Sequence, residues 1–133
     1  MVGLEEIQGN HLEIKLEMEN TKDGNFGIEV LRMDEQERGL RITINRDRDL
    51  IEVGNENGDF TLREDEPLSL RIFVDATLVE VYANERQVVM ADLKRPAGSN
   101  SRDKVVLFST NRDLVFDEVV CWKMKSAYQR LQL

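Results

Sequence analysis

Apolar and polar residues alternate along much of the chain with a period of two. The clearest case is residues 11–18, where Leu12, Ile14, Leu16 and Met18 are separated by polar side chains. Alternate residues of a β-strand point to opposite faces of a sheet, whereas a helix repeats every 3.6 residues, so this pattern predicts a strand with one buried and one solvated face. The same signal predicts eight further strands, over residues 26–33, 40–45, 50–53, 68–75, 78–83, 88–93, 105–109 and 114–124.

Short clusters of turn-forming residues separate the predicted strands. They are rich in Gly, Asn, Asp and Ser, which tolerate turn conformations or hydrogen-bond their own backbone, and they lie at residues 23–25, 46–49, 54–59 and 96–100. None is long enough to be a linker between domains. We therefore predict an all-β fold, an antiparallel two-sheet β-sandwich of about nine or more strands. It is expected to fill residues 1–133 as a single module, with a lead-in over residues 1–10 and a tail over residues 126–133.

Residues 70–84 predict a β-hairpin with a two-residue turn at Ala76 and Thr77. In that register Val74 lies opposite Val79, and Ile72 lies opposite Val81, so these four side chains share the core face.

The opposite face of this hairpin carries Arg71, Phe73, Glu80 and Tyr82. Glu80 is expected opposite Phe73 and diagonal to Arg71, which favours an ion pair flanked by two aromatic rings. Two interpretations stay open: a structural acid that ties two strands together, and a glycan-contacting face built on Phe73 and Tyr82. The first is the more common use of such a pair in a sheet.

The hairpin sequence Leu-Arg-Ile-Phe-Val-Asp-Ala-Thr-Leu-Val-Glu-Val-Tyr-Ala-Asn, together with Trp122-Lys123-Met124, resembles the C-terminal module of glycoside hydrolase family 32. That family contains invertases, levanases, inulinases and sucrose-6-phosphate hydrolases. The resemblance implies a concanavalin A-like or jelly-roll-like sandwich, with Asp75, Asn84 and Trp122 as motif residues. The chain departs from the family pattern at residues 76–77, where a basic residue and a serine are usual, and at residues 85–87, which replace a glycine turn.

The resemblance also implies a function. In this family catalysis belongs to an N-terminal five-bladed propeller, whose Trp-Met-Asn-Asp-Pro-Asn-Gly, Arg-Asp-Pro and Glu-Cys motifs do not occur in this sequence. We therefore expect a non-catalytic accessory module that packs against the propeller of a fructan- or sucrose-cleaving hydrolase, stabilises it and has a role in homodimer formation. No catalytic, cofactor-binding or metal-binding residue is assigned.

A second functional interpretation is a stand-alone, lectin-like carbohydrate-binding module that binds fructan or another glycan. Exposed rings such as Phe73, Tyr82 or Tyr128 would provide its stacking surfaces, although aromatic residues make up only 6% of the chain. A third interpretation, a β-sandwich with no enzyme partner that is used only for protein contacts, also stays open.

Composition excludes several other classes. Twenty-six acidic residues against eighteen basic ones give a net charge of −8, which opposes binding to nucleic acid or to an anionic membrane surface. The sequence has no apolar stretch long enough to span a membrane and no signal-peptide pattern, so a soluble chain is expected, in a compartment that the sequence leaves open. One cysteine, Cys121, excludes an internal disulfide.

The remaining chemical candidates are weak. His11 is the only histidine and is expected at the surface rather than as a catalytic base, and the chain lacks the clustered ligands of a zinc site. Residues 55–59 lack the ligand spacing of a calcium loop and read as a solvated turn. Cys121 and Trp122 are neighbours in a predicted strand and must face opposite ways. Trp122 is expected to pack in the core, and a sugar-stacking platform is the alternative.

Overall fold

A computed structural model describes residues 2–8, 11–18, 25–32, 39–63, 65–94, 104–109 and 116–123. This part of the chain folds entirely into strands and connecting turns, which confirms the predicted all-β class. The strands are β1 (Val2–Gln8), β2 (His11–Met18), β3 (Phe26–Arg32), β4 (Leu40–Asn45), β5 (Leu50–Val53), β6 (Glu56–Asp59), β7 (Leu68–Asp75), β8 (Leu78–Ala83), β9 (Gln87–Asp92), β10 (Lys104–Ser109) and β11 (Phe116–Lys123).

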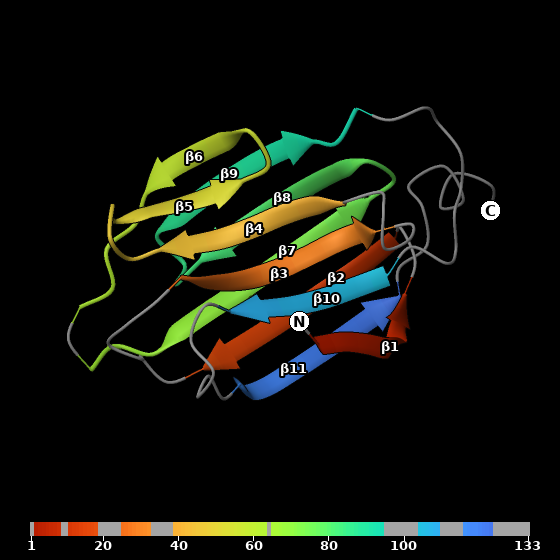
Figure 1. The fold of residues 1–133 in the computed structure, drawn as a ribbon, viewed down its shortest axis with the longest axis horizontal. Helices are drawn as coiled ribbons and strands as arrows, with labels where there is room; N and C mark the ends of the chain where they lie inside the picture. Colours follow the sequence, from red (N-terminus) through yellow and green to blue (C-terminus); the bar gives the residue numbers. More distant parts are fainter. Residues whose placement is uncertain are drawn as a thin grey trace.

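The strands form two antiparallel sheets that stack face to face (Figure 1). One sheet has six strands in the order β1-β10-β3-β4-β5-β6, and the other has five in the order β11-β2-β7-β8-β9. The predicted β-sandwich is therefore confirmed. At one side of the sandwich the edge strands β6 and β9 come into contact across the two sheets.

Each of the nine predicted strands is present, with ends that differ by at most two residues where the structure describes them. Residues 33, 114, 115 and 124 of the predicted strands lie outside the described residues, as do the predicted turns at residues 23–24 and 96–100, the tail over residues 126–133, and Tyr128.

Two strands were not predicted. The lead-in over residues 1–10 contains β1, which pairs with β10 at the edge of the six-stranded sheet. The cluster at residues 54–59, interpreted as a turn, contains β6, which pairs with β5 in the register Leu50 to Asp59. β6 is an edge strand of polar, mostly exposed residues, so it lacks the buried face that gives alternation its signal.

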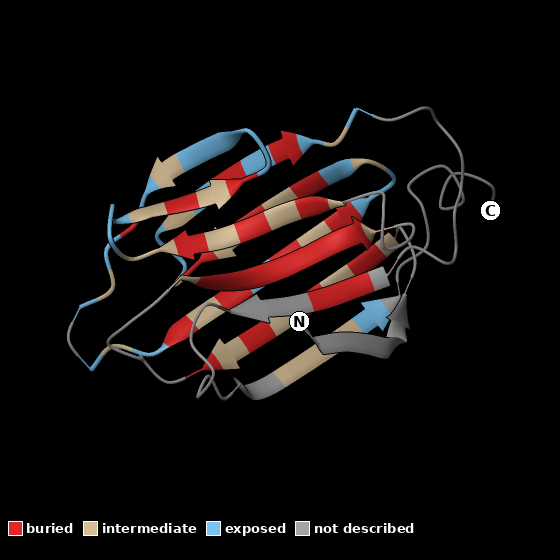
Figure 2. Cartoon of the chain, viewed as in Figure 1, coloured by how far each residue is buried: buried red, intermediate tan, exposed pale blue. Residues whose placement is uncertain are grey.

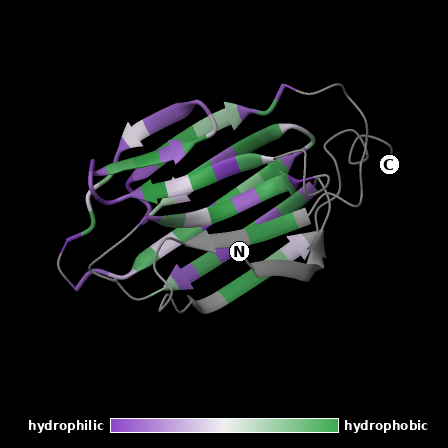
Figure 3. Ribbon diagram, in the orientation of Figure 1, coloured by the Kyte–Doolittle hydropathy of each residue, from purple (hydrophilic) through white to green (hydrophobic). Residues whose placement is uncertain are grey.

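The core lies between the sheets and is built from the inward-facing residues of both. In β2 every second side chain is buried, and β4, β7 and β8 show the same alternation (Figure 2). These buried positions are the apolar ones (Figure 3). Burying one Leu, Ile, Val or Phe side chain contributes about 1.5–3 kcal/mol, so the alternating face of each strand supplies much of the folding free energy.

Strand β3 departs from this alternation, because residues 26–31 are all buried. Glu29 lies on its outer side, is 1% exposed, and is held by Arg41 Nε at 2.9 Å and by Arg32 Nε at 3.4 Å. The backbone N–H of Gly39 also donates to the Glu29 carboxylate. A buried carboxylate is tolerated only with such partners.

The hairpin of β7 and β8 has the predicted register. Val74 lies opposite Val79, Ile72 lies opposite Val81, and Ala76 and Thr77 form the turn. Ala76 adopts a φ of 56°, a conformation in which glycine is usual at the first position of a two-residue hairpin turn.

Candidate functional site

The four predicted face residues lie together on the outer face of the five-stranded sheet. Glu80 of β8 is directly opposite Phe73 of β7, and Tyr82 is directly opposite Arg71. The rings of Phe73 and Tyr82 meet edge to face, with centroids 5.8 Å apart and planes at 84°. Such a pair is stabilised beyond the area it buries.

The predicted ion pair between Arg71 and Glu80 is wrong. Arg71 Nε instead lies 3.3 Å from a carboxylate oxygen of Glu13, which is on β2 at the other side of β7. Glu80 accepts a hydrogen bond from the Tyr82 hydroxyl, and this bond raises the pKa of Tyr82 above its ordinary value.

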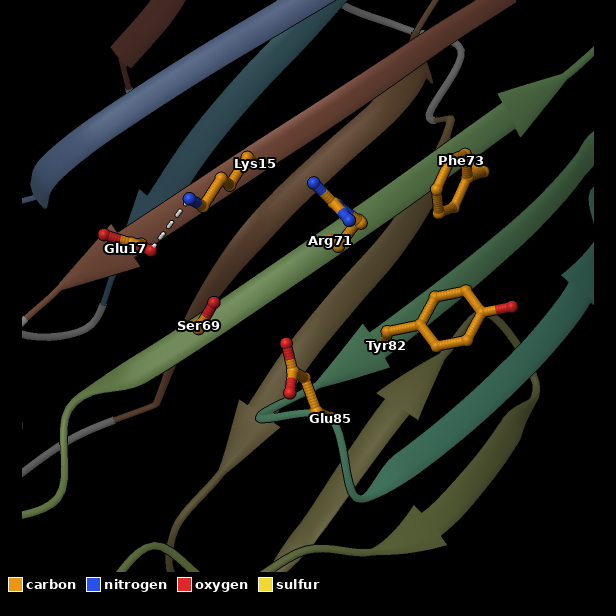
Figure 4. Close-up of a pocket in the computed structure, with 7 residues that line it drawn as sticks. All are labelled: Lys15, Glu17, Ser69, Arg71, Phe73, Tyr82 and Glu85. Atoms are coloured by element: carbon orange, nitrogen blue, oxygen red, sulfur yellow. Dashed lines mark ion pairs between the residues drawn. The ribbon is translucent and has the colours of Figure 1, made fainter.

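A groove opens on this face beside the aromatic pair (Figure 4). Its volume is about 430 Å³, within the range of small-ligand pockets. One side is formed by Lys15 and Glu17 of β2, which lie 3.2 Å apart.

The floor and the other side of this groove come from β7, β8 and the turn that follows. Ser69, Arg71 and Phe73 lie along β7, and Tyr82 and Glu85 close the groove from β8 and its turn. Lys15, Glu17, Ser69 and Glu85 were not predicted as site residues. Lys15 and Glu17 are brought to the groove by the pairing of β2 with β7, in which Lys15 lies opposite Arg71. The spacing of residues along the chain does not predict which distant strands pair.

The motif residues Asp75 and Asn84 tie the ends of β7 to their surroundings. Asp75 Oδ1 lies 2.9 Å from His11 Nδ1, and the two residues are opposite each other in adjacent strands. His11 is thus a partner of the motif aspartate at the start of β2. Asn84 Oδ1 accepts the backbone N–H of Ser69 at 2.6 Å, and Asn84 Nδ2 donates to the Pro67 carbonyl at 3.0 Å.

The expectation that Trp122 packs in the core is wrong. Cys121 faces Ile14 and packs against the core, so Trp122 projects outward with 44% of its surface exposed. Residues 119–122 are apolar at every position, and alternation alone therefore gave no direction. The pairing of β11 with β2 determines that Cys121, and not Trp122, faces the core.

A second hollow of about 340 Å³ lies at the edge where β6 approaches β9. Its main feature is Arg86, whose Nη2 donates to Glu66 at 2.8 Å and whose guanidinium lies 5.0 Å from the centre of the Phe60 ring. Hydrogen bonding to Arg86 lowers the pKa of Glu66 from 4.5 to about 2. These groups are paired with one another, which is typical of a structural cluster.

Among the described residues the buried acidic side chain is Glu29, which is paired with two arginines. Within the described ranges no three His, Cys, Asp or Glu side chains are grouped to hold a metal ion. The same part of the chain contains no helix with the length and apolar character needed to cross a membrane.

Comparison with protein families gives one match, which runs from residue 2 to residue 123 and is described as "Glycosyl hydrolases family 32 C terminal". The match covers all the described strands. This chain belongs to the family 32 C-terminal domains. The family resemblance identified from the sequence is thereby confirmed. Comparison with curated protein sequences finds no significant match.

Solved structures with the same fold include a sucrose-6-phosphate hydrolase and galectins. The family 32 domain superposes on sucrose-6-phosphate hydrolase from Lactobacillus gasseri with a TM-score of 0.67 and 21% identity, over 95% of this chain and 27% of that one. It also superposes on chicken galectin 2 with a TM-score of 0.71 and 8% identity, over 92% and 98% of the two chains. A toad ovary galectin in complex with thio-digalactose gives a TM-score of 0.61 at 7% identity. At these identities the likeness shows the fold alone.

Proposed function

We propose that this family 32 domain is the accessory module of a fructan- or sucrose-cleaving glycosidase, and that it packs against the catalytic propeller and stabilises it. The family match over residues 2–123 carries the proposal, because it assigns nearly the whole chain to the part of these enzymes that is not catalytic. The chain spans about a quarter of the length of the Lactobacillus gasseri hydrolase, which is in keeping with one module of a larger enzyme.

The distribution of exposed apolar side chains supports a docked partner domain. Among the described residues the large hydrophobic side chains that are exposed are Leu78, Val88, Met90 and Trp122, and all four lie on the outer face of the five-stranded sheet. Leu78, Val88 and Met90 lie together on the neighbouring strands β8 and β9, and we call these three residues the β8–β9 patch. Contacts between domains of one enzyme usually bury about 600–1,500 Å², and an exposed apolar patch is a suitable centre for one.

Thermal inactivation tests this proposal. A family 32 catalytic domain from the same organism, produced without its own C-terminal segment, is heated with and without the pure chain. We expect the chain to raise the temperature at which activity is lost, because a ligand that binds only the folded domain stabilises it by mass action.

Substitution of the β8–β9 patch shows whether this surface makes the contact. Met90→Glu combined with Leu78→Lys should abolish the stabilisation, because both charges would have to be buried at the interface. Asn57→Lys, an exposed change on β6 of the other sheet, is the matched control and should leave the stabilisation intact. Equal inactivation temperatures with and without the unmodified chain would refute the docking role.

A further inference from the structure

We propose that the groove between β2, β7 and the β8–β9 turn binds a neutral oligosaccharide. Positive and negative side chains balance one another around this groove. Lys15 and Arg71 bring two positive charges, and Glu17 and Glu85 bring two negative ones. A phosphate or carboxylate would meet both acids, and a cation would meet both bases, so the charges favour a ligand without net charge.

The lining of the groove also mixes hydrogen-bond donors with hydrogen-bond acceptors. Ammonium and guanidinium groups only donate hydrogen bonds, carboxylates only accept them, and the Ser69 hydroxyl does both. A sugar hydroxyl is also both donor and acceptor, and neighbouring hydroxyls can meet a donor and an acceptor that lie side by side. Lys15 and Glu17, 3.2 Å apart, provide such a pair. Hydrogen bonds to charged groups are stronger than those between neutral groups, which suits an open site.

One side of the groove is formed by an aromatic ring. Tyr82 lines the groove, and its orientation is fixed by the edge-to-face contact with Phe73 and by the hydrogen bond to Glu80. An immobilised ring offers apolar contact area to the C–H face of a sugar at little further cost in side-chain entropy. In Figure 4 this ring stands on the opposite side of Arg71 from Lys15.

The groove adjoins the proposed docking surface on the same outer face, because Tyr82 is directly opposite Val88 of the β8–β9 patch. Leu78 lies farther away, at the other end of the hairpin, opposite Asp75. The isolated chain leaves this face uncovered, so sugar binding can be measured without a catalytic domain, and the two proposals can fail independently.

Nitrogen-15 NMR titration of the full chain tests the inference. The probes are nystose and cellotetraose as neutral oligosaccharides, and glucose 6-phosphate as an anionic control. We expect saturable shifts for the amide signals of Ser69, Arg71, Tyr82 and Glu85 with at least one neutral probe, at millimolar affinity, and weaker or no shifts with the phosphate. Binding of neither neutral probe, or stronger binding of glucose 6-phosphate, would overturn the proposal.

Matched variants locate the binding. Tyr82→Ala should weaken it by about tenfold or more, and Tyr82→Phe, which keeps the ring, should weaken it less. Arg71→Met keeps the alkyl chain and removes the donors of a side chain that is 52% exposed, so it tests the groove even if Tyr82→Ala unfolds the protein. Asn57→Ala on β6 is the control outside the groove. Affinity that is unchanged in Arg71→Met and in Tyr82→Ala would place the binding elsewhere and refute the inference.

Discussion

Asn84 is predicted to stabilise the domain far more than its place in a turn suggests. Its side chain joins the turn after β8 to the start of β7 through two hydrogen bonds, at 2.6 Å to Ser69 and 3.0 Å to Pro67. Each such bond contributes about 1 kcal/mol. Asn84 also has a φ of 49°, where alanine costs about 1 kcal/mol more than asparagine. Asn84→Ala should therefore lower the free energy of unfolding by about 3 kcal/mol.

Urea unfolding followed by far-ultraviolet circular dichroism measures this loss. With a urea dependence of about 2 kcal/mol per M, the midpoint should fall by roughly 1.5 M. Asn84→Gly loses the same two bonds but tolerates the backbone conformation, so it should cost up to about 1 kcal/mol less than Asn84→Ala. Asn57→Ala on β6 should change stability by less than about 0.5 kcal/mol. A loss below about 1 kcal/mol in Asn84→Ala would show that the two hydrogen bonds do not stabilise the turn.

Three further predictions concern ion pairs and the exposed tryptophan. Because Arg86 lowers the pKa of Glu66 from 4.5 to about 2, their interaction is complete above pH 4.5 and is lost as the pH falls toward 2. The stability difference between the unmodified chain and Glu66→Gln, measured in urea, should shrink over that interval, and a constant difference would contradict this. Glu29→Ala should cost about 3 kcal/mol in the same assay, because it removes the buried carboxylate that joins β3 to Arg41 of β4, whereas a loss below about 1 kcal/mol would show that the pair is dispensable. Trp122→Ala should retain a cooperative unfolding transition with a loss of about 1 kcal/mol, below the 3–5 kcal/mol of a buried tryptophan, and a loss in that higher range would place the ring in the core.

The local features of the fold were predictable because their determinants are adjacent in the sequence. In the hairpin of β7 and β8, alternation and a two-residue turn fix which residues face each other, and the register of Val74 with Val79 followed directly. The nine strands with an apolar face were recognised for the same reason. Strand β6 carries polar residues along an exposed edge, so its pairing is set by the neighbouring β5 and leaves no hydrophobic pattern.

The candidate site was predicted only in part, because it depends on strands that are distant in the sequence. Phe73 and Tyr82 were placed on one face from the hairpin alone. Arg71 pairs with Glu13, which lies 58 residues earlier in the sequence. No local sequence pattern shows that Arg71 would pair with Glu13 rather than with Glu80. The outward direction of Trp122 likewise comes from the pairing of β11 with β2.

Central to the proposed function is that this family 32 domain has no catalytic activity of its own. The most direct measurement is the release of fructose from sucrose, levan and inulin by the purified chain alone. We predict no release above the rate measured in buffer, because residues 2–123 match the C-terminal part of the family 32 hydrolases and not their catalytic propeller. Saturable turnover that copurifies with the folded chain would contradict the central claim.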